Sequence, residues 1–124
     1  MEPLLLCVEM DPGKMLRLSF LASSLGIGVR EVPRDRQGMT LGMLCGMDRP
    51  GIGKHAQTAP GEMLVMAFLR EEQMDRLLRG MRESGCTVPL KAVLTPSNRH
   101  WTCCQLYREL EQEAKRIKSG KAGM

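Results

Sequence analysis

Two stretches of the chain, 59 positions apart, carry the same succession of an apolar run, a helical pattern and a second apolar run. The apolar runs 4–10 and 63–69 are each followed by apolar residues at helical spacing, which end at Gly26 and Gly85. Each stretch therefore predicts a strand, a helix and a strand. We interpret the repeat as a likeness of architecture, because few identities support it. The aligned pairs are Leu5 and Leu64, Met15 and Met74, Arg17 and Arg76, Leu18 and Leu77, Gly26 and Gly85, and Val29 and Val88.

Two βαβ halves predict an α/β (α+β) fold with a four-stranded, ferredoxin-like sheet. The runs 4–8 and 63–69 are apolar on both faces and are expected in the centre, whereas 29–32 and 90–95 alternate and are expected at the edges. The alternative is a small doubly wound parallel sheet. In the ferredoxin-like arrangement two helices cover one face only. The other face is then expected to meet a short Met-rich helix, the C-terminal helix, or a second copy in a homodimer.

The length of 124 residues predicts a single domain. We divide it into residues 1–47, the first half with the short helix at 40–47; 48–61, an exposed and mobile connector rich in Pro and Gly; 62–118, the second half with the C-terminal helix; and a tail, 119–124. The C-terminal helix begins at Thr102 with a capping box to Gln105. Its apolar face runs to Ala114 and Ile117, which predicts that the helix packs along its length.

Charge and hydropathy exclude several classes of protein. The net charge is +4, with part of the excess in the C-terminal tail, and aromatic residues make up only 3%, so a nucleic-acid partner is not expected. The first apolar run lacks a basic leader and is too short for a membrane span. We therefore expect a cytoplasmic protein with no membrane partner.

Five cysteines without a CxxC pair predict free thiols, and small buried packing residues explain Cys103 and Cys104. A thiol-dependent enzyme or redox sensor that uses these two cysteines is the alternative, because they lie in the first turn of a helix. Met39, Met43 and Met47 are interpreted as core packing and His55 and His100 are isolated, so no metal site and no cofactor are predicted. The loop 50–55 lacks the residues of a phosphate-binding loop. No catalytic residues are predicted, which does not favour an enzyme.

The sequence Pro89-Leu90-Lys91-Ala92-Val93-Leu94-Thr95-Pro96-Ser97-Asn98-Arg99-His100-Trp101-Thr102 resembles the bacterial family known as domain of unknown function 3783, over residues 62–113. The resemblance implies a bacterial cytosolic protein without an assigned activity. Arg70 departs from the pattern, where a small capping residue is expected, and this puts the start of the second helix in doubt.

The family-like positions suggest a site for a partner or ligand at Lys91, Thr95, Asn98 and Trp101. Local structure also explains Trp101 through a hydrophobic staple, and Asn98 through a turn. Lys91 in mid-strand either holds an anionic group or protects an edge strand from unwanted pairing. We expect a non-enzymatic binding or regulatory module for a protein partner or a small anionic ligand.

Overall fold

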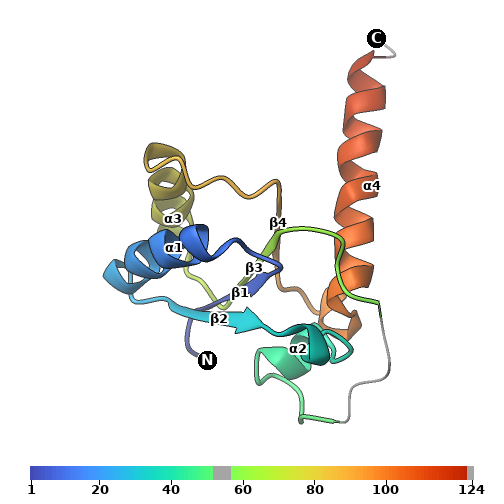
Figure 1. Cartoon of the computed structure of the whole chain (residues 1–124), viewed down its shortest axis with the longest axis horizontal. Coiled ribbons are helices and arrows are strands. Elements are labelled where there is room, and N and C mark those ends of the chain that lie inside the picture. The colour runs from blue at the N-terminus through green and yellow to red at the C-terminus, as the bar shows by residue number, and fades with distance from the viewer. Residues whose placement is uncertain (52–56, 123–124) are drawn as a thin grey trace.

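The computed structural model of the chain describes residues 1–51 and 57–122 (Figure 1). The elements follow one another as β1 (Leu4–Val8), α1 (Pro12–Ser24), β2 (Gly28–Val32), η1 (Arg34–Arg36), α2 (Leu41–Leu44), β3 (Met63–Ala67), α3 (Glu71–Glu83), β4 (Leu90–Val93), η2 (Asn98–His100) and α4 (Cys103–Ala122). Both predicted βαβ halves are present. None of the helices in this part of the chain is both long enough and apolar enough to cross a membrane.

The four strands form one sheet in the order β2-β1-β3-β4. The predicted α+β class is confirmed, as is the central position of the first and third strands. β1 pairs with β2 in parallel, β3 pairs with β4 in parallel, and the two central strands are antiparallel. The exact ferredoxin-like order is not confirmed, because each edge strand lies beside the central strand of its own half. The antiparallel central pair also excludes the alternative, a wholly parallel doubly wound sheet.

The strands and helices of the two halves follow the internal repeat of the sequence closely. β1 and β3 are 59 positions apart at both ends, and so are α1 and α3. Leu6 pairs with Val65, its own counterpart, so an approximate two-fold axis passes between them. A three-residue insertion precedes β4, and from there the offset is 62, which relates Gly28 to Leu90 and the helix caps Thr40 to Thr102.

The boundaries of α1 and α3 follow from their caps. Asp11 accepts the backbone N–H of Gly13 at 2.9 Å, as its position before Pro12 predicts. α3 begins at Glu71 although Arg70 has no capping side chain, because the backbone N–H of Arg70 donates to Oε1 of Gln73 at 2.9 Å. Gly26 and Gly85, with φ of 74° and 70°, end the two helices in the left-handed conformation.

The central strands end earlier than their apolar runs. Glu9 and Phe68, again 59 positions apart, have φ of 51° and 62°. This left-handed backbone is uncommon for residues other than glycine, and it turns the chain out of the sheet. β1 therefore stops at Val8, as expected for the run 4–8, whereas β3 stops at Ala67, short of the expected end at residue 69.

Helices of this chain cover both faces of the sheet (Figure 1). On one face, α1 and α3 lie side by side over Leu5, Cys7 and Leu64. On the other face, Leu41 and Leu44 of α2 and Cys103 and Leu106 of α4 pack over Leu6, Val8 and Val65. The short helix and the C-terminal helix thus cover the second face, as one of the sequence-based options proposed.

The short helix, the connector and α4 differ from expectation in detail. α2 is one turn long, because Cys45 ends it and Gly46 takes a positive φ, so the predicted helix at 40–47 is too long. The expected exposure of the connector is wrong at Ala59, which is buried. Residues 52–56 of the connector, including His55 and most of the loop 50–55, lie outside the described residues.

The C-terminal half of α4 projects away from the sheet (Figure 1). Residues 111–118 are all exposed, and Ile117 is 63% exposed. Packing along the whole length of this helix was therefore a wrong prediction. The helix passes the edge of the core after about two turns, and its remaining apolar residues have no neighbouring element to contact in the described part of the chain.

Candidate functional site

The structure uses Thr95 and Asn98 to build a tight turn after β4. Oδ1 of Asn98 accepts the backbone N–H of Thr95 at 2.8 Å, and Oγ1 of Thr95 accepts the backbone N–H of Asn98 at 3.0 Å. The side-chain amide of Asn98 donates to the carbonyl of Val93 at 3.0 Å. Both side chains satisfy backbone groups, which is the usual role of these residue types in turns.

The side chains of Lys91 and Trp101 form no hydrogen bond with Thr95 or Asn98 in the described part of the chain, although the backbone N–H of Trp101 donates to the carbonyl of Asn98 at 3.0 Å. The ammonium of Lys91, which is exposed on the edge strand β4, donates to the carbonyl of Val88 at 2.8 Å. Trp101 packs against the core, and its carbonyl accepts the backbone N–H of Leu41 at 2.9 Å. The predicted capping box is present, since Oε1 of Gln105 accepts the backbone N–H of Thr102 at 2.8 Å. No hydrogen bond among the described residues joins Lys91 to Thr95 or Asn98.

All five cysteines are buried free thiols, as predicted. Burial, the largest effect, raises the pKa of Cys103 to about 12. The Sγ atom of Cys104 accepts a hydrogen bond from Nε of Arg108 at 3.4 Å. A buried thiol with a raised pKa forms little thiolate near neutral pH, so the thiol-dependent alternative is not favoured. Within residues 1–51 and 57–122, no cluster of three His, Cys, Asp or Glu side chains is arranged to hold a metal ion.

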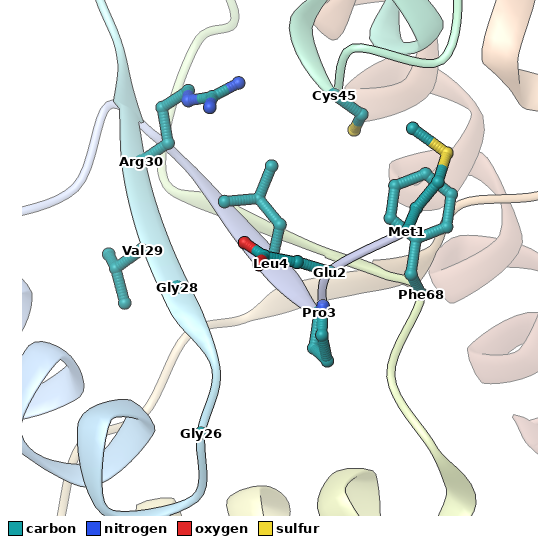
Figure 2. A pocket seen from close by; sticks show the side chains of 10 residues that line it. All are labelled: Met1, Glu2, Pro3, Leu4, Gly26, Gly28, Val29, Arg30, Cys45 and Phe68. Atoms are coloured by element: carbon teal, nitrogen blue, oxygen red, sulfur yellow. The ribbon is translucent and has the colours of Figure 1, made fainter.

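A cleft lies in the first half of the chain, beside the edge strand β2 (Figure 2). Its volume is about 710 Å³. Its walls come from the N-terminal segment, β2, the end of α2 and the residue after β3; the residues that matter most are Glu2, Leu4, Gly28, Arg30, Cys45 and Phe68. Figure 2 shows the side chains of Arg30 and Cys45 on either side of Leu4, with the ring of Phe68 on the Cys45 side.

Arg30 is the one cationic side chain that lines this cleft within the described residues. Its Nη1 atom donates to the carbonyl of Leu44 at 2.6 Å, which ties the guanidinium to the end of α2. Burial, the largest effect, raises the pKa of Cys45 to about 11, and the charge of Arg30 acts in the opposite direction. The cleft thus combines the positive charge of Arg30 and the carboxylate of Glu2 with the apolar side chains of Leu4 and Phe68 and a neutral thiol.

Two of the residues that line the cleft are small where their counterparts in the second half are large. At the offset of 62, Gly28 corresponds to Leu90 and Cys45 corresponds to Tyr107. In the second half, the side chains of Leu90 and Tyr107 pack against the core. A Cβ atom added to Gly61, which corresponds to Glu2, would lie 2.9 Å from the Tyr107 hydroxyl oxygen. Cys45 therefore leaves unfilled part of the volume that the larger side chain of Tyr107 occupies in the second half.

Sequence reasoning expected the site in the second half and did not single out Arg30. The segment 29–32 was correctly expected to be a strand, but a charged residue on an edge strand is ordinary and gives no signal by itself. The signal that was available is the alignment of the two halves at the offset of 62. In this alignment Gly28 corresponds to a leucine and Cys45 corresponds to a tyrosine. That offset depends on the insertion before β4.

Comparison with protein families identifies a family that the second half of the chain matches. Residues 62–117 match the model of the domain of unknown function DUF3783. The second half of the chain is a DUF3783 domain. This confirms the resemblance stated from the motif at 89–102. The DUF3783 domain contains β3, α3, β4 and most of α4, and among the residues that line the cleft only Phe68 belongs to it. Comparison with curated proteins and with solved structures gave no match.

Proposed function

We propose that the protein is a non-enzymatic binding module and that the cleft beside β2 takes a small anionic ligand. The observation that carries the proposal is the position of Arg30, whose guanidinium is tied to the carbonyl of Leu44 at the wall of a cleft of about 710 Å³. Clefts of this size are typical of sites for small molecules. A guanidinium held in place binds a carboxylate with less loss of side-chain freedom than a mobile one.

The raised pKa of Cys45 supports binding more than catalysis. A protonated thiol is a weak nucleophile, and the cleft offers no imidazole among its lining residues in the described part of the chain. Glu2 is the one acidic group in the same lining set. These groups can hold a ligand, but they do not form a nucleophile with an adjacent base.

A titration of the isotope-labelled protein with acetate and propionate, followed by amide chemical shifts, tests the proposal. We expect saturable shifts at Gly28, Arg30 and Cys45, and their loss in Arg30→Gln. Arg17→Gln, which changes an exposed arginine on α1, is the matched control. Shifts that persist in Arg30→Gln and disappear in Lys91→Ala would place the ligand at Lys91 on β4, and would overturn the assignment to the cleft.

Self-association is the second candidate, and exposed apolar residues on α1 favour it. Phe20 is 73% exposed and Leu16, one turn earlier, is 62% exposed. Because α2 and α4 already cover the second face of the sheet, the exposed surface of α1 is a better candidate for a homodimer interface than the sheet face. Light scattering at micromolar concentration, with Phe20→Ser as the variant, tests it. A monomeric wild-type protein would reject this candidate.

A further inference from the structure

We infer that the ligand of the cleft carries an aromatic ring as well as a carboxylate, a class that includes phenylpropionates. The inference rests on the proposed function, since it names the chemistry of the ligand for the same cleft. It starts from the relation between Cys45 and Tyr107, which occupy equivalent positions after the helix caps Thr40 and Thr102.

The second half shows what fits such a space. Its cleft is closed by the ring of Tyr107, which packs with Leu90 and Ala92 on the core, and its hydroxyl reaches the backbone at Gly61. In the first half the positions that correspond to Leu90 and Tyr107 are Gly28 and Cys45, so the volume of about one leucine and one phenol side chain is missing. The open volume therefore has room for a ring.

The walls of the cleft match a ring in chemistry. Leu4 and Phe68 line it, and Figure 2 shows the ring of Phe68 facing the same space as Leu4. Aromatic rings gain from offset or edge-to-face contact with another ring in addition to the area they bury. Phe68 takes the position that Glu9 takes in the other half, so an apolar ring stands here where the other half has a carboxylate.

The charged side chains of the cleft, Arg30 and Glu2, favour a ligand with one negative group. Arg30 stands where the second half has Ala92, so the positive charge is particular to the open cleft. Nη1 of Arg30 is engaged by Leu44, and no second hydrogen bond of this guanidinium is formed within residues 1–51 and 57–122. Its remaining N–H groups match a carboxylate. Glu2 in the same lining set opposes a doubly charged group, which favours a carboxylate over a phosphate.

The test compares 3-(4-hydroxyphenyl)propionate with propionate, which lacks the ring, and with tyramine, which lacks the carboxylate. Affinities are measured from amide chemical shifts of the full-length protein. We expect 3-(4-hydroxyphenyl)propionate to bind at least about tenfold more tightly than either of the others, which corresponds to about 1.4 kcal/mol. Arg30→Gln should reduce the affinity about tenfold, and the control Arg17→Gln should leave it unchanged.

A second variant tests the space itself. Cys45→Phe places a ring at the position of Tyr107, and we expect it to abolish binding of 3-(4-hydroxyphenyl)propionate. Because Cys45 is buried, the circular dichroism and thermal unfolding of the Cys45→Phe variant are measured in parallel. If this variant is unfolded, Gly28→Leu is used in its place. This substitution introduces the leucine of the second half at an exposed position.

The outcomes separate the two proposals. Equal affinity for propionate and the phenylpropionate would overturn the aromatic assignment and leave the anion site standing. Equal affinity for tyramine would overturn the role of the carboxylate, and so would full affinity in Arg30→Gln. If none of the three compounds produces saturable shifts at the cleft, the proposed function and this inference both fail.

Discussion

The side-chain oxygen of Gln37 accepts the backbone N–H of Ala59 at 2.8 Å, while its amide donates to Oε1 of Glu9 at 2.9 Å. Gln37 is fully buried. A single glutamine thus links the end of β1 to the connector that leads to the second half. The bidentate partner of Glu9 is Arg34, whose Nε and Nη2 atoms each donate at 3.0 Å.

Replacing Gln37 with alanine should destabilise the protein by about 2 to 3 kcal/mol, because the buried N–H of Ala59 loses its acceptor. Urea unfolding measures the change. Gln112→Ala, at an exposed position of α4, is the control and should change the free energy of unfolding by less than about 0.5 kcal/mol. An equally small effect of Gln37→Ala would show that water or another group replaces this acceptor.

Glu9 should make stability depend on pH in the acid range. The hydrogen bond from Arg34, the largest effect, together with that from Gln37, lowers the pKa of Glu9 below its ordinary value of 4.5. A carboxylate whose folded pKa is lowered adds stability that is fully present above its unfolded pKa. That stability is lost as the pH falls below about 4.5 through the folded pKa.

Glu9→Gln should therefore lose less stability than the wild type between pH 7 and pH 3. Urea unfolding at the two pH values measures the difference, and Glu83→Gln, an exposed residue at the end of α3, should behave like the wild type. A wild-type loss that Glu9→Gln reproduces in full would remove Glu9 from the account of acid sensitivity.

Gly42→Ala should destabilise the protein although alanine is the better helix former. Gly42 is inside α2, where helix propensity alone would give a gain of about 0.5 to 1 kcal/mol. A Cβ atom there would collide with the carboxylate of Asp48 and lie 3.2 Å from the carbonyl oxygen of Arg99. We expect a net loss of about 1 to 3 kcal/mol.

Thermal or urea unfolding gives the sign of the Gly42→Ala effect directly. Gly51→Ala is the matched control, because its Cβ atom would lie at an ordinary contact distance of 3.5 Å from Met43. A gain of stability in Gly42→Ala would mean that Asp48 moves aside without cost, and that its ion pair with Arg99 does not fix the end of α2.

Cys103 should resist alkylation in the folded protein. Burial, the main cause, raises the pKa of its thiol to about 12, so only a very small fraction is thiolate at pH 8. Labelling of this position with iodoacetamide should be slower than in urea by on the order of a hundredfold or more. Mass spectrometry after digestion measures the rate at each cysteine. Rapid labelling of Cys103 without urea would revive the thiol-dependent alternative.

The two halves of α4 should respond differently to mutation. Leu106 is buried in the core, and Leu106→Ala should cost about 2 to 5 kcal/mol. Ile117 is exposed, and Ile117→Ser should change the free energy of unfolding by less than about 0.5 kcal/mol. A cost above about 1 kcal/mol for Ile117→Ser in dilute protein would indicate that the end of α4 packs on the body of the molecule.

Local chemistry predicted both ends of α1, the end of α3 and the start of α4 well. Asp11 before Pro12, Gly26 and Gly85 after their helices, and Thr102 with Gln105 each satisfy backbone groups within a few residues, so the sequence around them is sufficient. The end of β1 at Val8 was predicted, but the early end of β3 at Ala67 was not, because apolar periodicity does not reveal the positive φ at Phe68.

Long-range relationships were only partly predicted. The apolar pattern placed β1 and β3 in the centre, but it does not say which neighbour an edge strand pairs with, so the exact order was missed. The cleft was missed for a related reason. Its volume depends on the small size of Gly28 and Cys45. Their small size is informative only when the two halves of the sequence are aligned with each other.

The antiparallel pairing of Leu6 with Val65 has a consequence for the unit that the family describes. All five residues of β3 are buried, and one of its two edges is paired only by β1 of the first half. Residues 62–117 by themselves would expose that edge as an apolar, unpaired strand, which is a template for joining another chain. In this protein the first half of the chain supplies β1, the strand that pairs with this edge of the DUF3783 domain.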